Sequence, residues 1–201
     1  FIQDFIYRNR WENLRAVQVA AGEAVFNTDD NVLLCASTAS GKTEAAFFPI
    51  LTELYENPPA SVGALYIAPL KALINDQFSR LEELCEDAYI PVWHWHGDVS
   101  QAHKNKLLKN PSGILQITPE SLEALLMHKH MYIPKLFCDL RYIGIDEIHS
   151  LMRAQRGGQT MCLIERRSRL SGSSPRRIGL SATIGDMESA KRWLTGNSGR
   201  N

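Results

Sequence analysis

The chain has 201 residues, which is enough for one α/β domain with a well-buried core and short for two. Lysine plus arginine and aspartate plus glutamate both number 22, so the formal net charge is +0 and nucleic-acid binding has to be argued from local sites. No stretch has the apolar length of a membrane span, the first residues show no leader pattern, and the four separated cysteines lie in apolar-patterned segments. The cysteine spacing is not that of metal ligands, and it favours buried, reduced thiols in a cytoplasmic protein.

The predicted elements alternate between apolar strands and amphipathic helices. Helical spacing from Trp11 to Phe26 ends in a turn cluster, and the pattern then predicts helices over about 41–55, 72–84 and from 120 onward. Strands are predicted at 32–35, 64–68, 90–95, 114–117, 140–145 and 177–180. Continuously apolar strands alternating with helices indicate an α/β fold with a mostly parallel sheet covered on both faces. One domain over residues 1–195 is expected, and residues 196–201 read as unstructured or as the start of a linker.

The stretch between the first strand and the next helix carries the clearest chemistry. It reads ASTASGKT over residues 36–43. A strand that enters a helix through small residues places backbone N–H groups at the helix N-terminus, where the peptide dipoles favour an anion. Lys42 can then reach the β/γ-phosphates, and the Thr43 hydroxyl can ligate Mg²⁺. The other residues expected around the phosphates are Thr38, Ala39, Ser40, Gly41 and Glu44.

Two features bear on the strength of this phosphate-loop pattern. Ala36 and Ala39 stand where phosphate loops commonly have glycine, and each difference adds one methyl group. An ordinary strand–turn–helix junction is the alternative interpretation. The apolar strand before the loop and the amphipathic helix after it favour the phosphate loop.

Polar residues follow two later strands, at the sheet edge where ligands of open parallel sheets bind. Asp146 and Glu147 follow the fifth strand. We assign Asp146 to Mg²⁺ and Glu147 to the water that attacks the γ-phosphate, with a solvated acidic loop as the alternative. Ser181 and Thr183 follow the sixth strand. Their hydroxyls could hydrogen-bond His149 and so transmit the state of the γ-phosphate.

The ordered set of motifs resembles the first RecA-like domain of superfamily 2 DEAD/DEAH-box helicases, and it covers nearly the whole chain. The motifs are ASTASGKT at 36–43, PLKAL at 69–73, TPE at 118–120, DEIH at 146–149 and SAT at 181–183. With RGGQ at 156–159 and LIER at 163–166, the chain most resembles the large helicase-related (Lhr-like) group. The resemblance implies a RecA-like P-loop NTPase fold, a three-layer sandwich, and an ATP-dependent nucleic-acid helicase or translocase that uses ATP and Mg²⁺.

The resemblance also implies roles for individual residues of the nucleotide site. Lys42, Asp146, Glu147 and His149 match the catalytic positions of the family. Gln18 matches the glutamine that reads the adenine edge, and Trp11 or Tyr7 is the candidate for the aromatic that packs on the base. For Gln18 the alternative is an exposed amide on a helix surface.

A second set of residues matches segments that line the single-strand track in this family. Contacts there would go mainly to phosphate and sugar, so DNA is favoured over RNA only by the Lhr-like resemblance, which also implies 3′ to 5′ movement. For Arg153 and Arg156 the alternative is a solvated helix face. The residues assigned to the track are Pro69, Lys71, Gly97, Thr118, Pro119, Glu120 and Arg156.

The family closes its ATP site with a second RecA-like domain that supplies arginines, and no such domain follows Thr183 here. The chain therefore reads as half of a motor with feeble activity of its own. Two other functions stay open: a nucleotide-gated nucleic-acid-binding module without turnover, and an unrelated P-loop phosphotransferase such as a kinase.

Two aromatic clusters have competing interpretations. His94 and His96 share one face of a strand, with His103 downstream, but only Asp98 adds a ligand at a suitable spacing, so a metal site is disfavoured. Trp93 and Trp95 alternate in the same strand, which favours core packing over base stacking.

Overall fold

The fold is built on six parallel strands in one sheet. The computed structural model describes residues 2–37, 40–86, 88–153, 155–182 and 184–201. The strands, in the spatial order β1-β6-β5-β2-β4-β3, are β1 (Val32–Cys35), β6 (Arg176–Ser181), β5 (Tyr142–Ile145), β2 (Ala64–Ile67), β4 (Ile114–Ile117) and β3 (Val92–Trp95). All six predicted strands are confirmed, and because they run parallel their carboxyl ends meet at one edge of the sheet.

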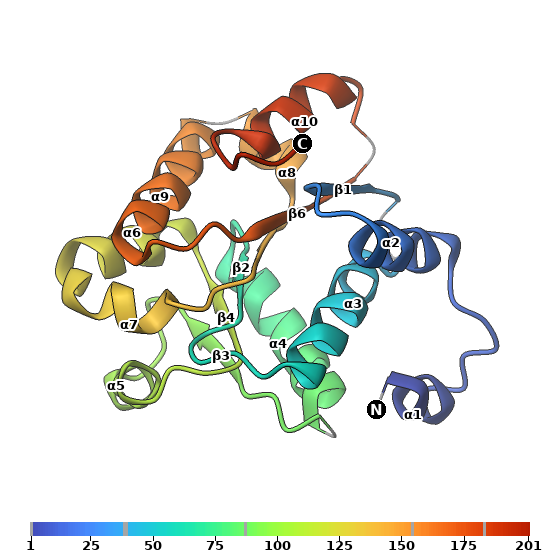
Figure 1. Cartoon of the computed structure of the whole chain (residues 1–201), viewed down its shortest axis with the longest axis horizontal. Helices are drawn as coiled ribbons and strands as arrows, with labels where there is room; N and C mark the ends of the chain where they lie inside the picture. Colours follow the sequence, from blue (N-terminus) through green and yellow to red (C-terminus); the bar gives the residue numbers. More distant parts are fainter. Residues whose placement is uncertain (1, 38–39, 87, 154, 183) are drawn as a thin grey trace.

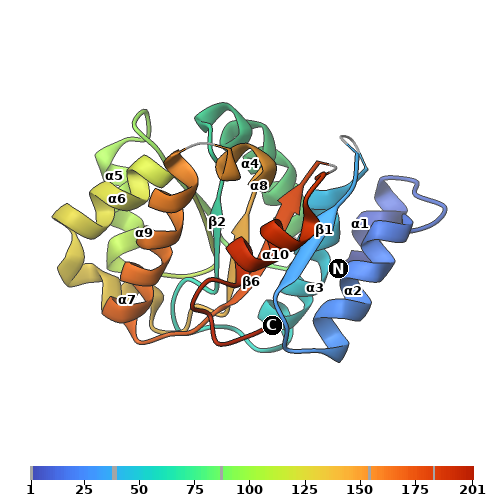
Figure 2. The same ribbon diagram turned by 90° about the horizontal axis from the view of Figure 1, so that it is seen from above.

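Helices cover both faces of this sheet (Figures 1 and 2). Alternate residues of β2 enter the two cores: Tyr66 packs with α1 to α4, and Leu65 packs with α5 to α10. This is the three-layer arrangement that the sequence predicts. The helices are α1 (Ile2–Arg8), α2 (Ala16–Asn27), α3 (Lys42–Glu56), α4 (Lys71–Glu86), α5 (Gln101–Lys109), α6 (Pro119–His128), α7 (Ile133–Phe137), α8 (Ile148–Met152), α9 (Gln155–Ser171) and α10 (Met187–Thr195), with a 3-10 turn η1 (His130–Tyr132) before α7.

The first predicted helix begins later than expected. Helical spacing predicted a lead-in from Trp11, but α2 starts at Ala16 because Arg15 is extended (φ −72°, ψ 151°) and caps the helix. The Arg15 N–H donates to Gln18 Oε1 at 2.9 Å, which closes the first turn. Residues 11–14 therefore precede the helix, and Arg15 is its N-terminal cap.

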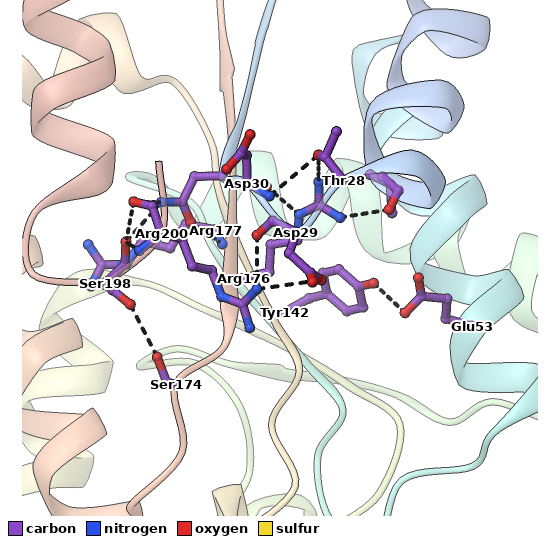
Figure 3. Close-up of polar contacts among 12 residues, drawn as sticks. Thr28, Asp29, Asp30, Glu53, Tyr142, Ser174, Arg176, Arg177, Ser198 and Arg200 are labelled. Carbon is purple, nitrogen blue, oxygen red and sulfur yellow. Dashed lines mark hydrogen bonds and ion pairs between the residues drawn. The ribbon is translucent and has the colours of Figure 1, made fainter.

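Two adjacent arginines at the start of β6 hold helices on opposite faces of the sheet (Figure 3). Arg176 donates to the carbonyls of Ala24 and Val25 at the end of α2, and Arg177 donates to those of Leu194 and Thr195 at the end of α10. The last carbonyls of a helix have no intrahelical donor and carry the negative end of the dipole, so a guanidinium there satisfies both needs. The alternation of side chains along β6 thus fixes both helical layers.

The segment from 196 to 201 has no helix or strand, but it is held in place. The Asn31 N–H donates to the carbonyl of Asn201 at 2.7 Å, and Asn31 Nδ2 donates to Ser198 Oγ at 2.8 Å. The tail is therefore attached to the loop between α2 and β1 rather than loose, and its role as a linker stays a prediction. Among the helices that the structure describes, none is both long and apolar enough to cross a membrane.

Candidate nucleotide site and nucleic-acid face

A pocket of about 300 Å³ opens at the carboxyl edge of the sheet, between the ends of β1 and β5. The sheet order places only β6 between these two strands, so residues more than 100 positions apart in the sequence meet here. The convergence predicted for Lys42, Thr43, Asp146 and Glu147 is confirmed. The lining consists of Trp11, Arg15, Ser40, Gly41, Lys42, Thr43, Glu44, Gln77, Arg80, Asp146, Glu147 and Leu180.

The loop before α3 has the geometry of an anion cradle. Gly41 has φ +81°, and a Cβ there would lie 2.8 Å from Gln18 Nε2, so the position requires glycine. Lys42 Nζ donates to the carbonyls of Ala36 (2.7 Å) and Ser37 (2.8 Å), which places its ammonium inside the curve of the loop. Ser40 Oγ is buried without a hydrogen-bond partner in the described part of the chain. Thr38 and Ala39 lie outside the described residues.

Asp146 is held in a buried hydrogen-bond network. Its Oδ2 accepts from the Tyr66 hydroxyl at 2.6 Å and from Gln77 Nε2 at 3.1 Å, and its Oδ1 accepts from the Glu147 N–H at 2.9 Å. Burial raises the pKa of the Asp146 carboxyl, and these hydrogen bonds together with the Lys42 charge oppose the rise. The carboxylate is thus fixed in orientation and faces the Lys42 side of the pocket.

Tyr66 reaches Asp146 because Gly144 leaves room for its ring. Tyr66 on β2 pairs in register with Gly144 on β5, and Asp146 follows two residues later on the same face. A Cβ at Gly144 would lie 2.7 Å from Tyr66 Cδ2. The absence of a side chain at this position therefore lets the ring lie over β5.

Glu147, His149 and Ser181 form a chain of hydrogen bonds. His149 Nδ1 accepts from the Ala182 N–H at 3.3 Å and lies 3.0 Å from Ser181 Oγ, which confirms the predicted contact between His149 and Ser181. Since a backbone N–H only donates, Nδ1 is unprotonated and Nε2 carries the proton. Nε2 lies 3.0 Å from Glu147 Oε2 and donates to it. Thr183 lies outside the described residues.

Glu147 itself occupies an unusual backbone conformation. Its φ is +51°, in the left-handed region that few residues other than glycine adopt. Residues held there cost free energy and cluster at functional sites. The turn separates Asp146, at the end of β5, from α8, and directs the Glu147 carboxylate to His149.

The adenine-side candidates lie next to the same loop. Gln18 is buried, with 4% of its surface exposed, so the alternative of an exposed surface amide is wrong. Its Nε2 has no hydrogen-bond partner within the described ranges, and Gly41 is its close neighbour. Trp11 lines the pocket and packs edge-on against Phe5, whereas Tyr7 is 85% exposed. The geometry therefore favours Trp11 over Tyr7.

The buried donors fit a nucleotide. Ser40 Oγ and Gln18 Nε2 are polar atoms that the described residues leave without partners, and both flank the loop. The loop adds a lysine, and Thr43 and Asp146 provide the hydroxyl and carboxylate oxygens that Mg²⁺ prefers. The chemistry of this donor set suits a magnesium-bound triphosphate.

Ion pairs join the residues predicted for the nucleic-acid track into one face at the ends of β2, β4 and β3. Lys71 Nζ lies 2.7 Å from Asp98 Oδ2, which links the start of α4 to the loop after β3. Arg156 donates to the Pro69 carbonyl at 3.1 Å and to Glu120, which links α9 to the loop after β2 and to α6. Arg156 is therefore anchored to two other segments although 38% of its side chain is exposed, whereas Arg153 is exposed, in keeping with the alternative of a solvated helix face.

The other predicted track residues differ in what they expose. Thr118 is 7% exposed, and its Oγ1 accepts from the Ser121 N–H and caps α6. Pro119 is buried in the first turn of α6, and a Cβ at Gly97 would meet nothing within 4 Å. The side chains of Thr118 and Pro119 thus shape the start of α6, whereas the Glu120 side chain is 57% exposed.

The sequence pattern of DEAD/DEAH box helicases matches residues 15–191. The chain belongs to the DEAD/DEAH box helicase family. It is 37% identical over 187 residues to the ATP-dependent helicase Lhr-Core of Methanothermobacter thermautotrophicus, which covers 84% of this chain and 21% of that protein. The predicted resemblance to Lhr-like helicases is confirmed.

Solved structures agree with this DEAD/DEAH box assignment. The crystal structure of DUF1998 helicase MrfA has a TM-score of 0.83 at 31% identity, covering 97% of this chain and 31% of that one. The structure of Mycobacterium smegmatis helicase Lhr bound to ssDNA and AMP-PNP has a TM-score of 0.80 at 29% identity, covering 95% and 26%. The fold is RecA-like, as predicted. The chain spans about a fifth of the length of the Lhr-Core relative.

Several residues of this helicase site were missed by sequence reasoning. Tyr66 and Gln77 hold Asp146, Arg15 lines the pocket, and Arg80 donates to Glu44. Tyr66 sits in an apolar run that reads as core, and Gln77 and Arg80 lie on a helix that reads as amphipathic. Only the pairing of β2 with β5, which the sequence does not reveal, would have directed attention to Tyr66.

The histidine and tryptophan clusters pack at the edge strand β3. The His94 ring centroid lies 5.5 Å from that of His96 and 5.0 Å from that of His103. Among the residues that the structure describes, no group of three or more histidines, cysteines or carboxylates is placed to hold a metal ion. Trp93 and Trp95 are buried in the core, as predicted.

Proposed function

We propose that this chain is the ATP-binding half of an ATP-dependent nucleic-acid helicase or translocase. The observation that carries the proposal is the meeting of Lys42, Thr43, Asp146 and Glu147 at one pocket, beside a face that joins Lys71 and Arg156. Both lie at the same edge of the sheet. Hydrolysis of ATP to ADP and phosphate can therefore be coupled to a strand bound a few loops away.

The residues of the loop bind and orient the nucleotide. Lys42 exchanges the carbonyls of Ala36 and Ser37 for the β/γ-phosphates, and the N–H groups at the start of α3 face the same anion. Gln18 reads the adenine edge with its unpartnered Nε2, and the base packs on Trp11. Ser40, Gly41 and Glu44 complete the loop side, together with Thr38 and Ala39.

The residues after β5 orient the attacking water. Thr43 and Asp146 would hold Mg²⁺, which when bound supplies positive charge against the phosphate oxygens. Glu147 accepts the proton of the water, and the His149 Nε2–H holds its carboxylate in place. Ser181 and Ala182 hold His149 by hydrogen bonds. A movement of the Glu147 side chain would therefore be transmitted through His149 to the end of β6. Thr183 is proposed to share this coupling role.

The face at the ends of β2, β4 and β3 binds a single strand through its backbone. Lys71 and Arg156 are ion-paired to Asp98 and Glu120, so binding exchanges a carboxylate partner for a phosphate. DNA is favoured over RNA because MrfA and Lhr are described as bound to DNA and ssDNA. Movement in the 3′ to 5′ direction follows from the Lhr-like assignment. Backbone N–H groups near Pro69, Gly97, Thr118 and Pro119 complete the contacts.

A second RecA-like domain is proposed to complete the ATP site. An arginine that stabilises charge in the transition state accelerates such reactions by roughly 10³–10⁵. The chain alone should therefore bind nucleotide and hydrolyse it feebly. The cysteine pattern of the sequence favours a cytoplasmic location. Cys85 is buried as expected, but Cys138 and Cys162 are exposed, so the expectation of buried thiols is wrong for these two.

The test is ATP hydrolysis by the complete protein with single-stranded DNA, single-stranded RNA and duplex, at two salt concentrations. We expect stimulation by a single strand that weakens as salt rises, and loss of hydrolysis in Glu147→Gln with nucleotide binding retained. Asp186→Asn, at an exposed helix cap remote from the pocket, is the matched carboxylate control. If the protein binds nucleotide and single strand but does not hydrolyse ATP, it is instead a nucleotide-gated binding module. If Glu147→Gln hydrolyses ATP at the wild-type rate, Glu147 is not the residue that accepts the proton of the attacking water.

A further inference from the structure

A second pocket, of about 640 Å³, lies between α9 and α10 and shares no residue with the nucleotide pocket. Figures 1 and 2 place these two helices side by side on one face of the sheet. Nothing in the proposed ATPase cycle uses this pocket. Its lining consists of Met161, Cys162, Glu165, Arg166, Arg169, Arg192, Trp193, Gly196 and Asn197.

Buried contacts fix the floor of this α9–α10 pocket. Arg177, whose side chain is 3% exposed, donates to Glu165 at 2.5 Å and to the last carbonyls of α10. A Cβ at Gly196 would lie 2.8 Å from Arg177 Nη1 and 2.9 Å from Met161 Cε, so the end of α10 can approach α9 only with glycine there. These contacts give the floor a defined shape, and the Arg177–Glu165 ion pair leaves it without net charge.

The rim of the α9–α10 pocket is strongly cationic. Arg166 and Arg169 are exposed on one side of α9 and have no ion-pair or hydrogen-bond partner within the described ranges. Across the groove Arg192 donates to Ser189 Oγ at 3.2 Å. The hydrogen bonds from Ser189 lower the pKa of the exposed Asp186, and the Arg192 charge contributes less, so this charge is only partly shared. Glu165, the one carboxylate in the lining, is already bound by Arg177. In a chain of zero formal net charge, this concentration of guanidinium groups indicates an anionic ligand.

The chemistry of the rim favours phosphate. A guanidinium presents a planar fork of donors that matches a phosphate, and a tryptophan face stacks on any nucleobase. Trp193 is half-buried and packs against the core, and it lines the pocket together with Met161. We propose that this pocket binds a nucleotide of single-stranded nucleic acid, with the base against Trp193 and the flanking phosphates on Arg166 and Arg169.

The course of α9 connects this site with the proposed strand track. Arg156 in the first turn lies on the nucleic-acid face, and Arg166 and Arg169 follow 10 and 13 residues later in the same helix. At a rise of 1.5 Å per residue the separation is about 15–20 Å, which a few nucleotides can span. The inference rests on the proposed function, because the strand that enters this pocket is the one proposed to bind the face at the ends of β2, β4 and β3. An acidic protein segment is the competing occupant.

The experiment compares short and long single strands of oligo-deoxythymidine by fluorescence anisotropy. The short strand covers only the face at β2, β4 and β3, and the long strand extends past it on both sides. In Arg166→Gln/Arg169→Gln we expect roughly tenfold weaker binding of the long strand and a salt slope smaller by about 1.4, at about 0.7 for each lost phosphate contact, with the short strand unaffected. Trp193→Phe should retain part of the affinity for the long strand that stacking contributes, and Trp193→Ala should lose that contribution.

The control Lys106→Gln/Lys109→Gln removes the same charge from exposed residues of α5. It should leave both strands bound as in the wild type, and equal weakening in this control would overturn the proposal as a general charge effect. Unchanged binding of the long strand in the arginine variant overturns it as well and leaves the proposed function intact. If the wild-type chain binds no strand of either length, the proposed function and this inference both fail.

Discussion

Replacing Tyr66 with phenylalanine removes one buried hydroxyl from beside Asp146. Tyr66 is 0% exposed and Asp146 is 4% exposed. The Tyr66 hydroxyl donates a 2.6 Å hydrogen bond to the carboxylate of Asp146. A buried hydrogen bond to a charged group contributes about 1.5–3 kcal/mol, so we expect a loss of that size in the free energy of unfolding. A loss near 2 kcal/mol should lower the Tm by roughly 4–8 °C for a chain of this size.

The same change should weaken magnesium-dependent nucleotide binding. The hydrogen bond from Tyr66 opposes the rise that burial causes in the pKa of Asp146, and it also fixes the carboxylate. Loss of a group that orients a metal ligand typically costs 10–100-fold in metal affinity, and we expect the Mg²⁺ concentration for half-maximal binding of an ATP analogue to rise by that factor. The assay is a Mg²⁺ titration at fixed analogue concentration.

Tyr142→Phe is the matched control. Tyr142 also lies in the sheet and donates its hydroxyl to a carboxylate, that of Glu53, but at the opposite end of β5 from Asp146 (Figure 3). It should lower stability while leaving the Mg²⁺ titration unchanged. The reasoning is refuted if the two variants show the same Mg²⁺ dependence, because Tyr66 would then contribute packing and stability alone.

Three further predictions concern the loop, the helix caps and the histidines. Gly41→Ala should weaken nucleotide binding and cost about 1–2 kcal/mol in unfolding, since φ is +81° and the new Cβ would meet Gln18; unaltered affinity in a binding titration would contradict the cradle geometry. Arg176→Met should cost roughly 3 kcal/mol in urea unfolding because it removes the buried guanidinium that donates to the Val25 and Asp30 carbonyls, whereas Arg141→Met, which breaks a half-exposed pair with Asp139 and an exposed hydrogen bond to the Asn57 carbonyl, should cost under about 1 kcal/mol. Burial lowers the pKa of His94 and His103 in the folded state, so the unfolded chain binds protons first and stability should fall as pH drops below about 6.5. His94→Gln should flatten that decline in urea midpoints measured from pH 7.5 to 5, and an unchanged slope would exclude the cluster as its source.

The sequence predicts the part of the site that follows from strand order and local chemistry. Asp146 after the fifth strand, the loop before Lys42 and the hydroxyl of Ser181 near His149 are each read from a few consecutive residues, because parallel strands bring their carboxyl ends together. Tyr66 could not be read in this way. Its role depends on the pairing of β2 with β5 and on the missing side chain of Gly144, and both are relations between segments about 80 residues apart.

Charge is the other property that the sequence hides, because a net charge of +0 averages over pairs that only the fold creates. Lys71 and Arg156 face the proposed track with carboxylate partners, whereas Arg166 and Arg169 have none in the part of the chain that the structure describes. A phosphate that binds Lys71 or Arg156 has to displace the carboxylate of Asp98 or Glu120. A phosphate that binds Arg166 or Arg169 displaces only water. The strand track should therefore gain less free energy from each cation than the α9–α10 pocket does, even though the track lies beside the ATP site. Under the proposed function, this difference would allow the track to release its strand in each cycle of ATP hydrolysis while the α9–α10 pocket keeps the strand attached.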